Sequence, residues 1–291
     1  MRALVFGATG QVARELARSA ADHGVDAVFL GRSAADLADP GTCARAIHAA
    51  LADVVVNAAA YTAVDRAEDE PELARLVNAE APRVMAAAAA AKGVPFLHVS
   101  TDYVFDGTPG RPWREDDPTG PLGAYGASKL AGERGVAVAG GDSVVLRTAW
   151  VFSAHGQNFV KTMLRVGRGK PEMRVVADQL GGPTPAGAIA DALWTVATAW
   201  HQGLGKSGTF HFAGDPAASW ADFAEAIFAR AGWDSRPRVV PIATADWPTR
   251  ARRPANSVLD CTAIAEAYGI AQPDWRAGLD AVIAELAEER A

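Results

Sequence analysis

The stretch RALVFGATGQVA, residues 2–13, decides the fold, because an apolar run passes directly into a glycine-rich turn. The run predicts a β-strand, and the residues after the turn have helical spacing. Glycines at Gly7 and Gly10 permit a tight turn and let a diphosphate approach the backbone. The following helix N-terminus offers free N–H groups and the positive end of its dipole. An ordinary strand-to-helix turn has the same composition, but the position on the first strand favours a dinucleotide site.

Outward from this stretch, the first half of the chain alternates short apolar runs with helical patterns. The predicted strands are residues 3–6, 27–30, 54–57, 96–100 and 144–147. The predicted helices are residues 11–23, 43–50, 72–92 and 125–138. Because both faces of the strands are apolar, the pattern predicts an α/β fold, a Rossmann-like doubly wound parallel sheet with helices on both sides.

The pattern changes past about Trp150, where longer irregular stretches carry Pro, Gly and Trp. Helices are predicted at residues 186–201, 220–231 and 275–289. We therefore expect an NAD(P)-binding Rossmann domain over residues 1–150 and a smaller C-terminal substrate-binding lobe over residues 151–291. The segment at about 186–201 could instead pack back on the first domain.

The composition narrows the functional classes. A net charge of −6 over 291 residues provides no basic surface, so no nucleic-acid partner is expected. No apolar run approaches the ~18 residues of a membrane span and no targeting segment stands out, so no membrane partner is expected. Cys43 and Cys261 lie far apart without ligand spacing, which disfavours a disulfide scaffold or a zinc site. These features predict a cytoplasmic protein with no metal.

The end of the second strand bears on the choice of cofactor. NAD-selective folds usually place an acid there for the ribose 2′-hydroxyl, whereas this sequence has Gly31 and Arg32. The guanidinium of Arg32 could pair with a 2′-phosphate, so NADPH is favoured and NADH is left open. A solvated surface arginine is the alternative. Asp36 and Leu37 could lie near the adenine or in a solvated turn.

Small residues follow the third strand, where Asn57 leads into three alanines and then Tyr61 and Thr62. Small side chains at a strand end let a cofactor lie close to the backbone. A buried alanine turn is the alternative reading of the same residues.

Tyr125 and Lys129, in the stretch AYGASK, carry the strongest chemical signal. Four residues apart on a helix, their side chains project from one face. The ammonium favours the phenolate, so Tyr125 could protonate the alkoxide that forms when hydride reaches a ketone. The strand ending in Ser100 and Thr101 supplies a hydroxyl for the carbonyl oxygen, with Thr101 favoured and Ser100 as the alternative. A chance YxxxK pattern on an exposed helix remains the alternative for the pair alone.

With these motifs in order, the sequence resembles the extended short-chain dehydrogenase/reductases, and among them the dTDP-4-dehydrorhamnose reductases. The matching stretches are FGATGQVARELARS, VVVNAAAYTAVDRAEDEPELA, STDYVFDGT, YGASKLAGE, LRTAWVF, NFVKTML, DQLGGPT and RRPANS. They run in order across nearly the whole chain. The resemblance implies a dTDP-sugar substrate and NADPH-dependent reduction of the 4-keto group of dTDP-4-dehydro-β-L-rhamnose to dTDP-L-rhamnose.

The resemblance also implies roles for individual residues. Tyr125 would be the proton donor, Lys129 its tuner and a ribose ligand, and Thr101 the partner of the carbonyl oxygen. From the motifs above and the resemblance together, the residues expected to contact the cofactor are Gly7, Gly10, Gln11, Val12, Arg32, Asp36, Leu37, Ala60, Tyr61, Thr62, Tyr125 and Lys129. The residues expected to contact the substrate are Thr101, Asp102, Tyr103, Trp150, Arg253 and Asn256.

Two of these assignments also make physical sense. The aromatic face of Trp150 could pack against the apolar side of a deoxysugar, with a core tryptophan as the alternative. Arg253 and Asn256 lie beside a second arginine in an otherwise acidic chain, which suits an anionic nucleotide sugar. A solvated loop is the alternative for this pair.

Two positions depart from the family pattern. Gly31 stands where relatives can carry an acid, which argues against efficient use of NADH. Some relatives dimerise through magnesium held by acidic side chains. Glu15 matches one such ligand, but another falls on Gly187, which has no side chain to bind a metal. A homodimer is left open, and a metal-bridged one is disfavoured.

Two other functions are left open by the sequence. A sugar-nucleotide epimerase of the same fold would hold NAD tightly, and the missing acid after the second strand disfavours it. A non-catalytic NADP-binding regulatory subunit would be expected to lose part of the set Thr101, Tyr125 and Lys129, whereas all three are present.

Overall fold

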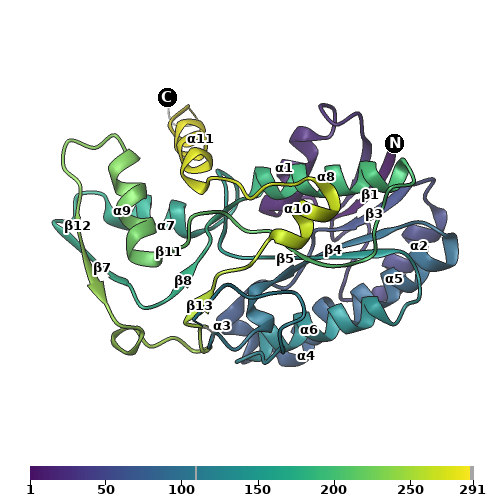
Figure 1. Cartoon of the computed structure of the whole chain (residues 1–291), viewed down its shortest axis with the longest axis horizontal. Helices are drawn as coiled ribbons and strands as arrows, with labels where there is room; N and C mark the ends of the chain where they lie inside the picture. Colours follow the sequence, from purple (N-terminus) through teal and green to yellow (C-terminus); the bar gives the residue numbers. More distant parts are fainter. Residues whose placement is uncertain (109, 289–291) are drawn as a thin grey trace.

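A six-stranded parallel sheet forms the centre of the computed structural model, which describes residues 1–108 and 110–288 (Figure 1). Its strand order is β10-β5-β4-β3-β1-β2. The strands are β1 (Arg2–Phe6), β2 (Asp26–Leu30), β3 (Val54–Asn57), β4 (Phe96–Thr101), β5 (Ser143–Thr148) and β10 (Gly208–His211). All neighbouring strands pair in parallel, which confirms the predicted fold class. The sequence did not predict β10, a strand of four residues at one edge of the sheet.

Helices cover both faces of this sheet, as Figure 1 shows. The helices α1 (Gln11–Ser19) and α8 (Ala186–His201) pack on one face. The helices α2 (Pro40–Ala49), α5 (Ala81–Lys92) and α6 (Ala124–Ala137) lie on the other. The apolar run of β3 reflects this double covering, because Val54 and Val56 belong to the core under α1 and α8 while Val55 belongs to the opposite core. The predicted helix at 186–201 therefore packs on the sheet, and Trp194 Nε1 donates to the carbonyl of Leu16 at 3.1 Å.

The segment predicted as one helix over residues 72–92 contains a change of helix type. It consists of α4 (Pro71–Arg75), a π-helical turn (Leu76–Glu80) and α5. Pro82 has no backbone N–H, so the hydrogen-bond ladder is interrupted there, and the wider turn precedes it directly. This turn carries Asn78 into the region of the site.

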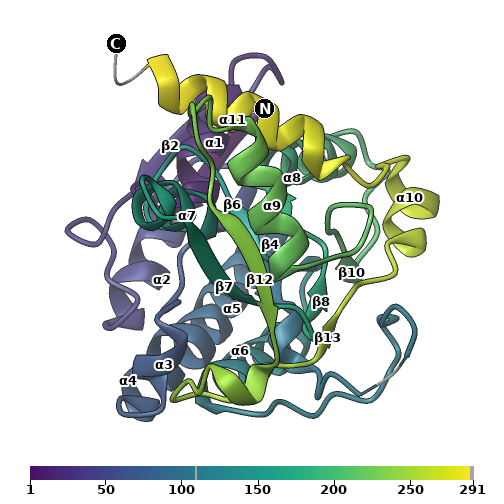
Figure 2. The same ribbon diagram turned by 90° about the vertical axis from the view of Figure 1, so that its left-hand side faces the viewer.

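The second half of the chain also builds a lobe beside the sheet, with its own core around Phe152, Phe223 and Leu279. Its helices are α7 (Phe159–Gly167), α9 (Trp220–Arg230) and α11 (Trp275–Glu288). Its strands are β6 (Val151–Phe152), β7 (Glu172–Val176), β8 (Leu180–Gly181), β9 (Thr184–Pro185), β11 (Ala218–Ser219), β12 (Arg238–Ile242) and β13 (Asn256–Ser257). Figure 2 shows β12 and β7 side by side next to α9. Glu289, the last residue of the predicted C-terminal helix, lies outside the described residues.

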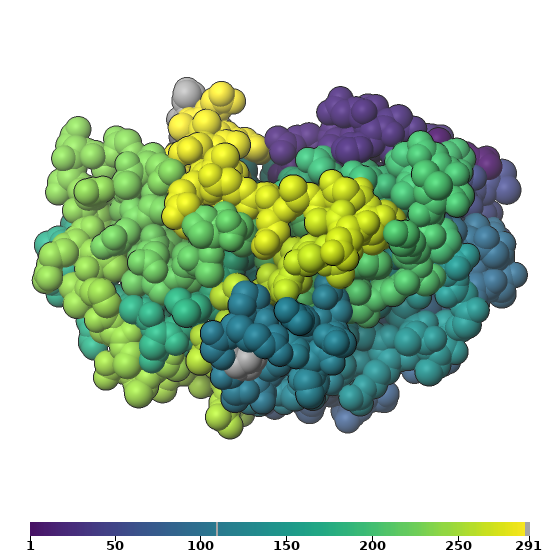
Figure 3. All heavy atoms as spheres, viewed as in Figure 1, coloured from purple at the N-terminus to yellow at the C-terminus, as the bar shows by residue number. Residues whose placement is uncertain are grey.

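The remaining short helices are α3 (Val64–Ala67) and α10 (Thr262–Tyr268). In the space-filling view, the C-terminal segment with α10 and α11 lies along the boundary between the second lobe and the part of the protein built on the sheet (Figure 3). An ion pair joins Arg18 of α1 to Glu285 of α11 at 3.6 Å. Within residues 1–108 and 110–288, none of the helices combines the length and hydrophobicity that a bilayer crossing requires.

Candidate active site

Several of the predicted site residues lie where the parallel strands end. The register aligns Phe6 of β1 with Asn57 of β3, and Asn57 with His98 of β4. Thr101 at the end of β4 pairs with Thr148 of β5. The glycine turn, the segment after β3 and the hydroxyl of Thr101 therefore follow neighbouring strand ends on one edge of the sheet, where open α/β folds bind their ligands.

Tyr125 is brought to this edge by the start of α6. The carboxylate of Glu68 accepts a hydrogen bond from the backbone N–H of Ala124 at 2.8 Å, which satisfies one of the free donors at the helix start. Gly126 allows the helix to approach the end of β4, because a Cβ there would lie 2.2 Å from the carbonyl oxygen of Tyr103. The ring of Tyr125 meets that of Tyr103 edge-on, with centroids 5.5 Å apart.

Burial is the main influence on the phenol of Tyr125 and raises its pKa, and the charge of Asp102 raises it further. A hydrogen bond with the side chain of Thr101 acts in the opposite direction. Asp102 is itself buried, which raises the pKa of its carboxyl to about 6. Its Oδ1 accepts from Thr101 Oγ1 at 3.0 Å. Tyr125, Thr101 and Asp102 thus form one buried group.

Lys129 lies one turn further along α6 and is buried. Its Nζ donates to the carbonyl of Val99 at 2.8 Å and lies 3.2 Å from His98 Nε2. Burial lowers the pKa of Lys129 to about 8, and the charge of Glu133 opposes this shift. The groups that shift the pKa of Tyr125 do not include Lys129. Its predicted role as the tuner of the phenol stays a prediction.

The two consecutive hydroxyls at the end of β4 have different partners. Ser100 Oγ donates to Glu133 Oε1 at 2.5 Å, and Glu133 in turn accepts from Arg147 Nη2 at 2.7 Å. All three side chains are buried. Ser100 is therefore committed to an ion pair inside the fold, whereas the hydroxyl of Thr101 is the one beside Tyr125.

The glycine turn has an open approach to the start of α1. Gly7 has φ = 115°, and a Cβ there would come within 3.3 Å of the carbonyl carbon of Ala58. A Cβ at Gly10 would meet no atom within 4 Å. Residues 8–10 are exposed, and α1 has no side-chain cap and no acid in its first turn. Its N–H groups and dipole are thus available to a diphosphate.

The first residues of α1 have different surroundings. Gln11 Oε1 accepts hydrogen bonds from Ser153 Oγ at 3.0 Å and Asn158 Nδ2 at 2.8 Å, which ties the turn to the second lobe. The side chain of Val12 belongs to the core. A contact between Val12 and a cofactor would therefore involve its backbone.

The residues after β2 also differ in whether their side chains are free to contact a cofactor. Arg32 is exposed, and within residues 1–108 and 110–288 no hydrogen bond or ion pair holds its guanidinium. Asp36 Oδ1 accepts from the backbone N–H of Ala38 at 2.9 Å, and the side chain of Leu37 is buried in the core on the α2 side of the sheet. Arg32 is thus the residue of this set with a side chain free for a phosphate.

The segment after β3 is held by Asn78, which the sequence analysis did not single out. Asn78 Oδ1 accepts from the backbone N–H of Tyr61 at 2.8 Å, and its Nδ2 donates to the carbonyl of the same residue at 2.9 Å. Nδ2 also lies 3.0 Å from Ser128 Oγ of α6. The hydroxyl of Tyr61 donates to Glu70 at 2.7 Å, and Thr62 is exposed. No sequence motif marks Asn78, because its reach depends on the π-helical turn.

Trp150 has a conformation and a partner that its sequence did not predict. Its φ is 48°, in the left-handed region, where a residue with a bulky side chain is strained. Its indole stacks on that of Trp220, with centroids 3.5 Å apart and planes at 9°. A Cβ at Gly181 would lie 2.5 Å from Cε2 of Trp150. One face of the Trp150 indole is thus covered by Trp220, so a sugar could pack only against the other face.

Arg253 and Asn256 have unequal roles in the loop before β13. Arg253 Nη2 pairs with Asp65 at 2.7 Å, while its buried Nη1 has no hydrogen-bond partner among the described residues. The charge of Arg253 also acts on the nearby phenol of Tyr103, where it opposes the larger effect of burial, which raises the pKa. Asn256 instead donates to the carbonyl of Arg111 at 2.8 Å. Arg253 offers a donor to an anion, and Asn256 braces a neighbouring loop.

At the position that was compared with the magnesium site of some relatives, a side chain of the protein itself, Arg18, supplies the positive charge beside Glu15. The carboxylate of Glu15 is buried and lies 2.5 Å from Arg18 and 3.6 Å from His155. Gly187 lies beside this pair. Among the residues that the structure describes, no three His, Cys, Asp or Glu side chains are grouped to hold a metal.

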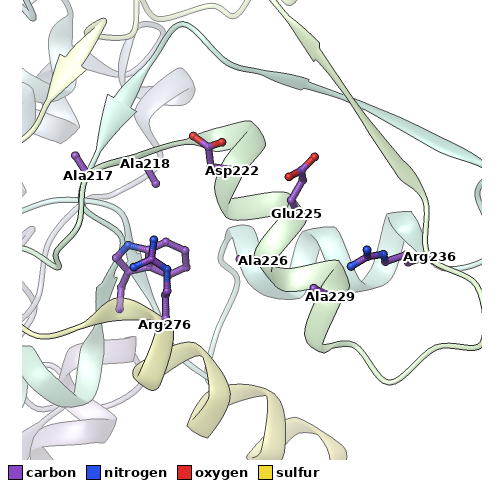
Figure 4. Close-up of a pocket in the computed structure, with 9 residues that line it drawn as sticks. Ala217, Ala218, Asp222, Glu225, Ala226, Ala229, Arg236 and Arg276 are labelled. Carbon is purple, nitrogen blue, oxygen red and sulfur yellow. The ribbon is translucent and has the colours of Figure 1, made fainter.

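A hollow of about 410 Å³ lies on the second lobe between α9 and α11 (Figure 4). Its polar lining consists of Asp222, Glu225, Arg236 and Arg276. None of the predicted site residues lines it, and its lining carries two acids of α9 and two arginines. The hollow is therefore separate from the strand-end site.

Comparisons with known proteins identify the family of the chain. The model of the RmlD substrate binding domain matches residues 1–288. A dTDP-4-dehydrorhamnose reductase of Burkholderia thailandensis is 50% identical, over 98% of this chain and 99% of the relative. A crystal structure of a dTDP-4-dehydrorhamnose reductase from Clostridium acetobutylicum has 35% identity and a TM-score of 0.91, over 99% of this chain and 100% of its own.

A further structure, of the dTDP-4-dehydrorhamnose reductase of Bacillus anthracis, was solved in complex with NADP. It has 31% identity and a TM-score of 0.90, over 98% of this chain and 99% of its own. Sequence and fold match over 99–100% of the length of these relatives. The chain belongs to the RmlD family, that of the dTDP-4-dehydrorhamnose reductases.

Proposed function

We propose that this chain reduces the 4-keto group of dTDP-4-dehydro-β-L-rhamnose to give dTDP-L-rhamnose, with NADPH as the reductant. The observation that carries the proposal is the buried group of Tyr125 and Thr101 at the end of β4, on the same edge of the sheet as the glycine turn. The relatives named as dTDP-4-dehydrorhamnose reductases, and the one solved with NADP, support the substrate and the cofactor.

The residues at the first two strand ends fit a phosphorylated dinucleotide. The uncapped start of α1 and the open space at Gly10 suit a diphosphate, and the free guanidinium of Arg32 suits a 2′-phosphate. The braced segment from Ala60 to Thr62 and the amine of Lys129 would border the rest of the cofactor. When bound, NADPH supplies the hydride for the substrate carbon.

Tyr125 would deliver the proton to the oxygen at that carbon. Its raised pKa keeps the phenol protonated at neutral pH, which is the form that a reduction consumes. Thr101 Oγ1, whose single proton is directed at Asp102 in this structure, would turn that proton to the same oxygen when the substrate binds and stabilise its growing negative charge. The ammonium form of Lys129 would lower the cost of the phenolate that Tyr125 leaves behind.

Other residues would hold the sugar nucleotide, and we also propose a location and an oligomeric state for the protein. We assign Arg253 to the diphosphate, since its Nη1 is buried without a hydrogen-bond partner among the described residues, and Asp102, Tyr103, Trp150 and Asn256 to the walls around the sugar. The lobe past residue 150 would be the substrate-binding part, with α8 and β10 returned to the sheet. A cytoplasmic location and a homodimer without a bridging metal complete the proposal.

A coupled assay tests this function. The keto sugar is generated in situ, and consumption of NADPH and NADH is compared for the wild type, Tyr125→Phe and Tyr268→Phe. We expect Tyr125→Phe to lose about 10²–10⁴-fold in turnover, the usual contribution of a positioned acid. Tyr268→Phe, whose hydroxyl contacts Lys206 away from the site, serves as the control and should keep its activity. Full turnover by Tyr125→Phe would refute the proton transfer, and conversion of a sugar without net NADPH loss would indicate an epimerase.

A further inference from the structure

A series of buried polar side chains runs from the segment after β3 to Lys129. Asn57 Oδ1 accepts from the backbone N–H of Ala59 at 3.1 Å, and Asn57 Nδ2 lies 3.1 Å from His98 Nδ1. His98 Nε2 lies 3.2 Å from Lys129 Nζ. Asn57 and His98 are fully buried, and Lys129 is 2% exposed. We call Asn57, His98 and Lys129 the polar series.

The donors in the polar series fix the position of the imidazole proton. A backbone N–H can only donate, so the atom of Asn57 that faces Ala59 must be its oxygen, and Nδ2 must face His98. Because Nδ2 is itself a donor, His98 Nδ1 has to accept. A neutral imidazole then carries its proton on Nε2, which points at Lys129 Nζ.

That tautomer suits an amine rather than an ammonium at Lys129. An ammonium has three donors and no lone pair, so it cannot accept from Nε2–H. A neutral amine can accept from His98 and still donate to the carbonyl of Val99, as the 2.8 Å contact requires. Protonation of Lys129 therefore either breaks one of the contacts in the polar series or requires the side-chain amide of Asn57 to flip. A flipped amide would place Nδ2, a donor, opposite the backbone N–H of Ala59.

The charged groups around the series do not remove this conflict. On α6, Glu133 favours the ammonium form, but its carboxylate is bound by Arg147 of β5 and by Ser100. Tyr125 lies one turn before Lys129 on α6, and the charge of Asp102, which directly follows β4, raises the pKa of Tyr125. Burial is the main cause that holds the pKa of His98 well below its ordinary value, so His98 stays neutral.

We propose that Asn57 and His98 are positioning residues that favour the uncharged form of Lys129 and couple its protonation to the backbone at Ala59. The coupled backbone belongs to the segment that is assigned to the cofactor, so ordering of that segment and the charge of Lys129 influence each other. The consequence for turnover rests on the proposed function. The tautomer of His98 does not depend on the proposed function.

The first test is the tautomer of His98 in the wild type, from the ¹⁵N shifts of its two ring nitrogens at pH 9. His98→Gln assigns the signal among the 6 histidines of the chain. We expect a protonated Nε2 and an unprotonated Nδ1. A protonated Nδ1 would mean that Lys129 donates to His98, and it would overturn the proposal without any variant having to fold.

The second test reverses the direction of the hydrogen bonds that His98 makes in the polar series. In Asn57→Asp a carboxylate accepts from both Ala59 and His98, so the imidazole proton should move to Nδ1 and Lys129 should favour the ammonium. We expect the alkaline limb of the pH profile of kcat/KM to move up by about one pH unit. His211→Gln removes an equally buried histidine of β10 that contacts Trp113 and Arg147, and should leave the limb in place.

The two tests separate this inference from the proposed function. A wild type with the expected tautomer but no keto-sugar reduction would refute the proposed function and still support the inference. A tautomer that moves in Asn57→Asp while the alkaline limb stays would overturn the coupling to Lys129. A limb that moves as far in His211→Gln would also overturn it.

Discussion

The two ends of the candidate site differ in how far the protein itself satisfies their polar groups. At the end of β4, Thr101, Asp102, Tyr125 and Lys129 are buried, and each interacts with other side chains or with the backbone. At the glycine turn and after β2, residues 8–10 and Arg32 are exposed, and no side chain caps α1. One end is organised by the fold, and the other is open to solvent.

The proposed function accounts for this difference. A proton donor must have a defined orientation and protonation state, and burial with fixed partners provides both. A phosphate site needs donors that are free to meet a strongly hydrated anion, and an exposed helix start with a free guanidinium meets that need. Substitutions at the buried end should therefore change chemistry and stability, while those at the open end should change affinity and its salt dependence.

After Tyr125→Phe, the largest loss of activity that would test this difference between the two ends is expected at Thr101. Thr101→Val keeps the shape of the side chain and removes the hydroxyl beside Tyr125. We expect kcat/KM for the keto sugar to fall about 10²–10³-fold, as when one donor to a developing oxyanion is removed. Steady-state kinetics with NADPH would measure the loss.

The neighbouring hydroxyl provides the matched control. Ser100→Ala leaves the buried Glu133 and Arg147 with one hydrogen bond fewer, so it should lower the free energy of unfolding by about 1–3 kcal/mol and leave kcat/KM near the wild-type value. If Ser100→Ala lost more activity than Thr101→Val, the assignment of the two hydroxyls would be reversed.

Asp102 gives a pH-dependent test of the buried end. Burial raises the pKa of its carboxyl from 3.8 to about 6. The folded protein therefore binds this proton more tightly than the unfolded chain, so its contribution to stability is complete below pH 3.8 and is lost as the pH rises through 6. The loss should be on the order of 2–3 kcal/mol in the free energy of unfolding.

The measurement compares the wild type with Asp102→Asn in urea unfolding from pH 4 to pH 7. The variant cannot titrate, so the stability of the wild type relative to it should decline with rising pH across the window from 3.8 to about 6. A constant difference would show that the carboxyl of Asp102 is as well solvated in the folded protein as in the unfolded chain.

The sequence predicted the parts of the molecule that depend on local pattern. Val54–Asn57 was predicted as a strand and 186–201 as a helix with the bounds that the structure has, because each is an apolar run bounded by turn residues. The strand β10 was missed because GTFH has no alternation and is held by its pairing with β5.

Contacts between distant residues could not be predicted in the same way. The stacking of Trp150 on Trp220, and the reach of Asn78 to Tyr61, depend on elements far apart along the chain. The partners of Lys129 depend on how closely α6 approaches β4. The YxxxK pattern predicts that Tyr125 and Lys129 share a helix face, but the surroundings of the amine come from the strand.

The smallest expected effect concerns Arg32 at the open end. Arg32→Ala should raise KM for NADPH about tenfold, since a charged hydrogen bond to phosphate contributes roughly 1.5 kcal/mol, and it should leave KM for NADH unchanged. Because the guanidinium is exposed, the preference of the wild type for NADPH over NADH should weaken with added salt. The preference of the variant should depend little on salt. An equal rise in KM for both cofactors would mean that Arg32 supports the turn after β2 rather than a 2′-phosphate. In that case the backbone of the glycine turn alone would bind the cofactor at the open end. Discrimination between NADPH and NADH would then have to come from the buried end.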